Sequence, residues 1–198
     1  MAIVVNHQNR WGLVWFGVLL ILLAATAEGR AFQASHDLVV SIEPEAARIS
    51  GTDHIRLKGG PEGILAIGLS PRVHISSLQI NGTDQAVITT TNGPAVDLSK
   101  IPAGDPIELV VHYTGQFQDK APVRPDNTDN PGYGVSGTIS PRGTLLLGGA
   151  GWYPAIDAAV ESVRLEVRAP EGMRAVSAGR LIGFSTQGGQ TISRWQID

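Results

Sequence analysis

Strict alternation of apolar and polar residues in several short runs constrains the fold of this chain more than any other feature. Leu38, Val40 and Ile42 alternate with polar neighbours, and the same two-residue period recurs at 107–113 and 163–168. A period of two places successive side chains on opposite faces of a β-strand, so each run predicts a strand with one buried face. Beyond the first segment, no window shows the 3.6-residue period of an amphipathic helix.

Turn-forming residues separate these runs. The chain of 198 residues holds 24 glycines and 12 prolines, which suits short strands joined by many turns. Between Val73 and Ile80 the apolar parity slips at Ser76-Ser77, which predicts a β-bulge, and Asn81-Gly82 then predicts a tight hairpin turn. Further strands are expected at 48–57, 85–91, 144–147, 173–177 and 191–197. The predicted fold is therefore an all-β, antiparallel β-sandwich-like domain.

The first segment has the three parts of a secretory signal. Residues 1–27 contain no acidic residue, and Arg10 precedes an uninterrupted apolar stretch that begins at Trp11. Ala25-Thr26-Ala27 then matches a signal-peptidase site, so we expect cleavage after Ala27. The alternative is an uncleaved hydrophobic anchor helix, since the stretch lies at the short end of the roughly 17–25 residues that span a bilayer. In both cases residues 28–198 form an exported domain, periplasmic or extracellular, or anchored in the membrane with the domain outside the cytoplasm.

Composition excludes several classes of chemistry and partner. The chain has no cysteine, which rules out disulfides, thiolate metal sites and cysteine nucleophiles. Lys and Arg number 15 against 18 Asp and Glu, with no basic block, so we expect no nucleic-acid partner.

A search for catalytic motifs finds none. No histidine begins a His-Glu-x-x-His motif, and Gly183–Gln187 lacks the second glycine of Gly-x-Ser-x-Gly. Gly148–Gly151 lacks the Lys and Ser/Thr of a phosphate loop, so it predicts a tight turn. The histidines of the exported part are expected to face solvent or to be held by hydrogen bonds, with metal ligation as the alternative; they are His36, His54, His74 and His112. We therefore predict no catalytic residue, cofactor-binding residue or metal ligand in this chain.

The longest irregular segment spans residues 116–137. It contains three prolines and the polar acidic run 126–130, and a segment of this length without regular structure is usually functional or disordered. Calcium binding is an alternative for the acidic run, but the run lacks the alternating ligands and the glycine of a calcium loop. A solvated loop is the expected interpretation.

The most specific part of the sequence is Gly151–Asp157, followed by the strand-like run Val160–Arg168, the proline turn Ala169–Gly172 and the segment Ala175–Gly179. This order of features resembles the N-terminal domain of the aminopeptidase N-type (gluzincin) zinc metallopeptidases. That domain carries a Phe-Pro-Cys-Phe-Asp-Glu-Pro segment, a strand, a proline turn and a strand ending in Ser-Asn-Gly. Tyr153–Ala159 is similar to the first of these and Ser177–Gly179 to the last. His36–Pro44 resembles the first strand of the family, and Ile49–Gly51 resembles the start of its second. The resemblance runs from His36 to Asp198 and implies a non-catalytic β-domain.

The resemblance also implies that the catalytic machinery lies downstream of this domain. Gly172-Met173-Arg174 does not match the family's substrate-gripping Gly-x-Met-Glu-Asn segment. We therefore expect zinc, and zinc-dependent aminopeptidase activity, only if a downstream catalytic domain exists, and we expect this chain to be a truncated or split piece of such a peptidase. Because the sequence stops within the predicted strand 191–197, we expect the isolated product to be marginally stable or self-associating. The alternatives are a stand-alone binding module with a protein or peptide partner, and a membrane-tethered structural subunit.

Two adjacent aromatic residues mark the candidate functional segment. Trp152 and Tyr153 lie between a glycine turn and a proline, and Asp157 follows them. All three could face a cleft shared with a catalytic domain. The alternative is that the aromatic side chains pack into one end of the sandwich, which is the commoner use of such residues.

Overall fold

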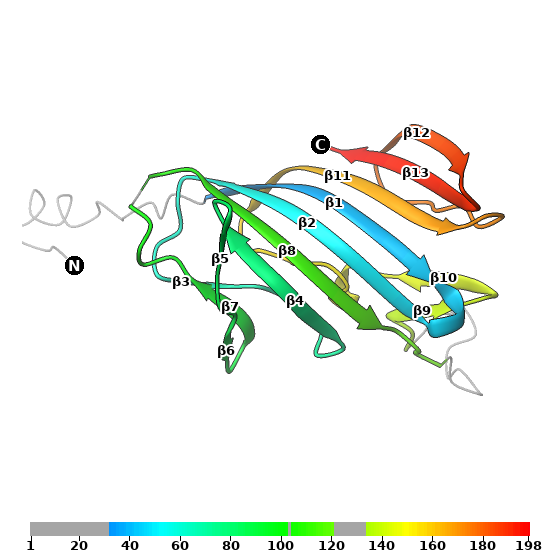
Figure 1. Cartoon of the computed structure of the whole chain (residues 1–198), viewed down its shortest axis with the longest axis horizontal. Coiled ribbons are helices and arrows are strands. Elements are labelled where there is room, and N and C mark those ends of the chain that lie inside the picture. Colours follow the sequence, from blue (N-terminus) through cyan, green and yellow to red (C-terminus); the bar gives the residue numbers. More distant parts are fainter. Residues whose placement is uncertain (1–31, 103, 121–133) are drawn as a thin grey trace, which may run out of the picture. The chain divides into compact units, whose positions relative to one another are not determined.

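The computed structural model describes residues 32–102, 104–120 and 134–198 (Figure 1). The predicted signal or anchor, residues 1–27, and the acidic run 126–130 lie outside the described residues. Within the described part, regular structure consists of β-strands and two short 3-10 helices, η1 (Pro44–Ala46) and η2 (Gly148–Ala150). None of the helices in these ranges is long and apolar enough to cross a membrane.

The largest element is a mixed sheet of eight strands in the order β12-β13-β11-β1-β2-β8-β4-β5 (Figure 1). Its strands are β1 (Gln33–Glu43), β2 (Arg48–Lys58), β4 (Val73–Ile80), β5 (Thr83–Asp84), β8 (Ile107–Gln116), β11 (Ala159–Pro170), β12 (Arg180–Gln187) and β13 (Gln190–Ile197). All neighbours are antiparallel except β1 and β11, which are parallel. The predicted all-β class is therefore confirmed, but a purely antiparallel arrangement is wrong. β1 and β11 are far apart in sequence, and alternation within a strand does not set the direction of a distant neighbour.

Two smaller sheets share one hydrophobic core with the large sheet. One contains β3 (Ile64–Ala66), β7 (Gly93–Asp97) and β6 (Ile88–Thr90), and the other pairs β9 (Gly137–Ser140) with β10 (Gly143–Leu146). Leu65, Val96 and Ile139 of the small sheets are buried in the same cluster as Leu57 and Leu78 of the large one. Figure 1 shows both small sheets on the same side of the large sheet.

The strongest strand predictions are confirmed. The runs predicted at 73–80, 107–113, 163–168 and 191–197 fall within β4, β8, β11 and β13. The register of β4 against β8 shifts between Ile75 and Ser77, which is the predicted bulge. Asn81 and Gly82 adopt φ angles of 48° and 77°, as a tight turn of this kind requires.

The strand predicted at 173–177 is wrong, and the one predicted at 85–91 is confined to Ile88–Thr90. Met173, Ala175 and Ser177 are half-buried and alternate with exposed residues, yet they pair with no strand. Alternation reports which residues face inward, but it does not show whether a neighbouring strand is present. The strands that the sequence does not predict are β3, β5, β7, β9 and β12.

The face of the large sheet opposite the core is polar and carries cross-strand ion pairs. Arg56 lies 2.8 Å from Asp37, and Lys58 lies 2.7 Å from Glu161. Glu166 of β11 binds two arginines, Arg168 and Arg194. We call this surface the charged face.

Candidate functional site

The segment containing Trp152, Tyr153 and Asp157 connects η2 to β11. Trp152 and Tyr153 are half-buried against the core, with ring centroids 4.7 Å apart. Asp157 is exposed. The rings of Tyr153 and His36 are nearly perpendicular, with their centroids 6.4 Å apart. The two aromatic rings therefore rest on the inner side of the large sheet, beside a buried histidine.

His36 and Asp53 form a buried polar pair beneath this segment. Their Nδ1 and Oδ2 atoms lie 2.8 Å apart, and the side chains are 4% and 0% exposed. Asp53 is flanked across the sheet by the apolar residues Leu38 and Val111. Burial raises the pKa of Asp53, against the lowering effect of its hydrogen bond to His36. Burying such a pair costs desolvation free energy. We infer that the pair, placed in an otherwise apolar row, helps to hold β1 and β2 in one register.

Tyr113 extends the polar cluster. Its side chain is 1% exposed, and burial together with the nearby Asp53 raises its pKa. Within the described ranges, neither the Tyr113 hydroxyl nor the second carboxylate oxygen of Asp53 has a hydrogen-bond partner. Gly51 lies against the Tyr113 ring so closely that a Cβ there would come within 2.5 Å of the hydroxyl oxygen. The ring can therefore occupy this position only because residue 51 has no side chain.

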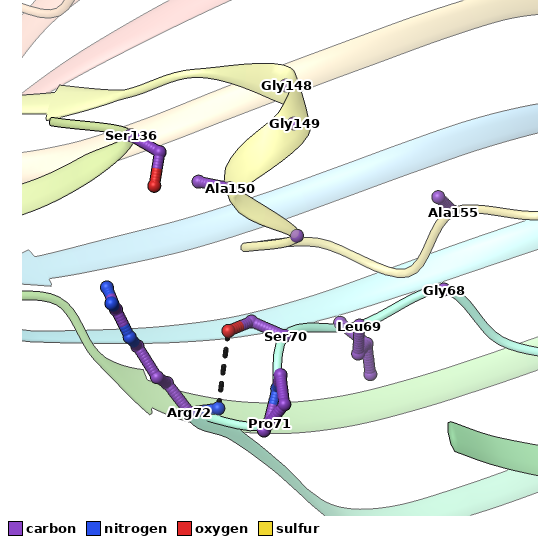
Figure 2. Close-up of a pocket in the computed structure, with 11 residues that line it drawn as sticks. Gly68, Leu69, Ser70, Pro71, Arg72, Ser136, Gly148, Gly149, Ala150 and Ala155 are labelled. Atoms are coloured by element: carbon purple, nitrogen blue, oxygen red, sulfur yellow. Dashed lines mark hydrogen bonds between the residues drawn. The ribbon is translucent and has the colours of Figure 1, made fainter. Parts of the chain in front are cut away.

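An open groove of about 650 Å³ lies beside the aromatic segment (Figure 2). The loop Gly68–Arg72 lines one side, Gly148–Gly151 and Ala155 line the other, and Ser136 lies at the rim. Figure 2 shows these two loops facing each other. Trp152, Tyr153 and Asp157 are not among the lining residues.

Backbone hydrogen bonds fix the two loops to each other. Gly68 and Ala155 exchange both of theirs, at 2.7 and 3.0 Å, and the Ser70 amide donates to the Gly151 carbonyl at 2.9 Å. Gly151 adopts φ of 63°, and a Cβ there would come within 2.6 Å of the Ser70 amide nitrogen. Glycine is therefore required at position 151 both by its backbone conformation and by the close approach of the opposite loop.

Arg72 and Asp119 form a charged pair at one end of the groove. Nη1 of Arg72 lies 2.6 Å from Asp119 Oδ1, and Asp119 Oδ2 accepts hydrogen bonds from the backbone amides of Ser136 and Gly137 at 2.9 and 2.8 Å. These donors, and above all the two amides, hold the pKa of Asp119 well below its usual range. A second hollow of about 410 Å³ adjoins this pair and is also lined by Gln116 and Gln118.

The polar side chains that line the groove or lie beside it are engaged in hydrogen bonds within the chain. The Ser70 hydroxyl accepts a hydrogen bond from the Arg72 amide, and the Ser136 hydroxyl donates to Asp119. The strongly lowered pKa of Asp119 makes it a poor general base. Among the described side chains, no three His, Cys, Asp or Glu residues lie close enough to hold one metal ion. The donor set of these residues therefore does not fit a zinc site, which needs at least three protein ligands.

The sequence held a signal for the buried pair that motif searching missed. Asp53 has the same parity as Ile49, Ile55 and Leu57, and His36 has the same parity as Leu38. A polar residue in an apolar row marks a buried hydrogen-bonded group. Arg72 and Asp119 carried no comparable signal.

Comparisons with known proteins find similarity in structure only. No family model matches the chain, and no curated protein matches it in sequence. A mutant of the M1 zinc metallopeptidase from Deinococcus radiodurans, solved with a Tyr-Ser-Ala substrate, matches with a TM-score of 0.63 and 17% identity. The match covers 84% of this chain and 39% of that one. The chain has the fold of the N-terminal domain of M1 zinc metallopeptidases.

Two further structures support this assignment of fold. The M1 zinc metallopeptidase of the same bacterium, in a second structure, matches with a TM-score of 0.57 and 20% identity over 84% of this chain and 39% of that one. Native yeast LTA4 hydrolase matches with a TM-score of 0.52 and 16% identity, over 85% of this chain and 27% of the hydrolase. The resemblance to aminopeptidase N-type enzymes is therefore confirmed as a likeness of fold. This chain spans well under half the length of each of these proteins.

Proposed function

We propose that this chain is an exported, non-catalytic β-domain of a zinc metallopeptidase of the aminopeptidase N type. The observation that carries the proposal is the fold match, which covers 84% of this chain but only 39% of the metallopeptidase. In this proposal a separate catalytic domain, on a longer polypeptide or on a second chain, holds the zinc and cleaves the peptide. The β-domain supplies a rigid surface against which that domain packs.

The coding DNA provides the first test. We expect a reading frame encoding His-Glu-x-x-His either directly downstream of the codon for Asp198 or in a neighbouring gene. That product is then expressed with and without the 198-residue chain, and its zinc content and its hydrolysis of aminoacyl-p-nitroanilides are measured. We expect zinc and turnover to accompany the His-Glu-x-x-His product. One tightly held zinc per isolated 198-residue chain, or turnover by that chain alone, would refute the proposal.

Export is the second part of the proposal. The charged start, the apolar stretch and Ala25-Thr26-Ala27 support cleavage after Ala27. N-terminal sequencing of the exported protein is expected to begin at Glu28. A mature protein that retains Trp11 and fractionates with membranes would replace the cleaved signal by an anchor.

A stand-alone binding module is the second candidate function. The groove between Gly68–Arg72 and Gly148–Gly151 favours it, since its volume of about 650 Å³ falls in the range of ligand sites. Folding and binding measured with and without the His-Glu-x-x-His protein distinguish the two candidate functions. A binding module folds and binds its partner without any His-Glu-x-x-His protein, whereas the β-domain of a peptidase gains stability when the catalytic domain is present.

A further inference from the structure

The two ends of the large sheet present different edges. At one end, β5 is two residues long and covers only Gln79 and Ile80 of β4, and β4 itself bulges between Ile75 and Ser77. Short edge strands and bulges are means by which proteins keep a sheet edge from pairing with another chain. This end of the sheet is therefore protected.

β12 forms the other end of the sheet and is less protected (Figure 1). It is eight residues long, and among the described residues its backbone pairs with β13 alone. Its register against β13 shifts between Leu181 and Gly183, but the pairing is regular from Gly183 to Gln187. Arg180 is the only charged residue of the strand. The segment Gly183–Gln187, which has no charge, proline or bulge, therefore presents a backbone edge that can accept a further strand.

Phe184 adds apolar surface to this edge. The register places Phe184 opposite Ser193 of β13, which is buried, so both side chains lie on the core-facing side of the sheet. Phe184 is nevertheless 49% exposed. Thr186 lies on the same side as Phe184, because side chains alternate along a strand. Ser185, between them, is exposed and lies on the side of the charged face.

We propose that β12 is a dimerisation strand, which pairs antiparallel with β12 of a second copy of this chain about a two-fold axis at Ser185. A strand that pairs antiparallel with its own copy does so about a two-fold axis, and such an axis closes the assembly at two chains. Centred on Ser185, the pair contains the whole regular segment, with Gly183 opposite Gln187 of the second copy. The two large sheets then form one continuous sheet with both charged faces on the same side.

The side chains of this segment are compatible with their own copy, which favours a second copy as the occupant. In this register Phe184 of each chain lies opposite Thr186 of the other, and pairs of aromatic and β-branched residues stabilise antiparallel strands. Arg180 lies outside the paired segment, so no like charges are placed opposite each other. The dimer goes beyond the proposed function and does not depend on it, since neither the fold match nor a catalytic domain enters the reasoning.

A charge placed on the axis tests the proposed dimer. Light scattering of the exported protein is expected to show a concentration-dependent dimer at micromolar concentrations. S185K places two lysines opposite each other, so we expect it to raise the dissociation constant of the dimer at least tenfold, and S185E to do the same. An equal mixture of S185K and S185E should form a dimer again, because each lysine then lies opposite a glutamate.

The matched control for these variants is S77K. Ser77 is also an exposed strand serine, but it lies in β4, near the opposite end of the sheet. We expect S77K to dimerise like the wild type. Circular dichroism of each variant verifies that the β-sheet is retained, so that a loss of the dimer is not mistaken for a loss of the fold.

A cysteine on the axis provides a second, independent measurement. The chain has no cysteine, so S185C introduces a single thiol. Residues opposite each other in an antiparallel pair have Cα atoms about 4.5–5.5 Å apart, which is within the range that a disulfide spans. We therefore expect S185C to run as a disulfide-linked dimer on a non-reducing gel after mild oxidation, and S77C to run as a monomer.

Several results would overturn the proposed dimer, and each points to a different arrangement. A wild-type chain that stays monomeric at millimolar concentration does not pair through β12. A dimer that both S185K and S185E leave intact forms through another surface, and one that S77K dissociates forms at the β4–β5 end of the sheet. If the wild type is a monomer and the His-Glu-x-x-His product protects the amides of residues 183–187 from hydrogen exchange, the catalytic domain covers β12 instead. Scattering that shows ever larger oligomers would exclude closure by a two-fold axis.

Discussion

Replacing Gly51 by alanine tests the packing of the polar cluster. Gly51 sits in β2 under the ring of Tyr113, and an added Cβ would lie within 2.5 Å of the hydroxyl oxygen and 2.8 Å of Cε1. Carbon atoms in contact normally lie about 3.5–4.0 Å apart, so the methyl group and the ring overlap. Tyr113 is 1% exposed, and its ring has no open space into which it can turn.

The expected loss follows from this overlap. Overpacking a well-packed core costs about 1–3 kcal/mol, and 1 kcal/mol lowers the melting temperature by roughly 2–4 °C in a domain of this size. We therefore expect G51A to melt roughly 2–12 °C below the wild type, in the upper part of that range because the ring is enclosed.

Thermal unfolding followed by circular dichroism measures this loss. G148A is the matched control, since a Cβ at Gly148 meets nothing within 4 Å, and we expect its stability to stay within about 0.5 kcal/mol of the wild type. The double variant G51A/Y113L makes room for the methyl group. Its drop in melting temperature is therefore expected to be smaller than the sum of the drops measured for G51A and for Y113L. If G51A melts like G148A, the ring of Tyr113 does not rest on residue 51.

Three further predictions concern the titratable groups. D119N is expected to lower the melting temperature at pH 7, because the pKa of Asp119 is lowered in the folded chain. The difference should begin to close as the pH falls below about 4, where the carboxyl protonates in the unfolded chain while it is still ionised in the folded one. A constant difference down to about pH 3 would exclude this explanation. D53A leaves the buried His36 without its partner and should lower the free energy of unfolding, measured in urea, by about 3–5 kcal/mol, whereas H36L/D53L should lower it much less. If the losses of the single variants at positions 36 and 53 add up in the double variant, the two side chains are not coupled. Y113F should melt at or above the wild type, because the hydroxyl has no partner among the described residues, and a loss of more than about 1 kcal/mol would reveal one.

The strands at the centre of the sheet could be predicted because local pattern and long-range packing agree there. β1, β8 and β11 each bury one row of apolar residues, and the bulge in β4 left its mark as a slip in parity. β12 escaped prediction because its register shifts between Leu181 and Gly183, which breaks the alternation. The segment 173–177 shows the reverse case, since it alternates but pairs with no strand.

The candidate site was predictable only in part. The sequence pointed to Trp152, Tyr153 and Asp157, and the structure places the two aromatic rings beside the groove without making them its lining. The groove itself joins Gly68–Arg72 to Gly148–Gly151 through backbone hydrogen bonds. Contacts between segments so far apart depend on how the whole chain packs, and a local pattern carries no record of them.

The sequence by itself determined which side chains of each strand face inward, because the two-residue period is a property of the extended backbone. It thereby placed Asp53 in an apolar row and left the segments around the groove nearly free of charge. Only the tertiary structure decided that Asp53 meets His36, that β1 runs parallel to β11, and that Arg72 is held by Asp119 at the end of a groove. Each of these depends on strand register and on the closure of long loops, which are set by the burial of the core as a whole.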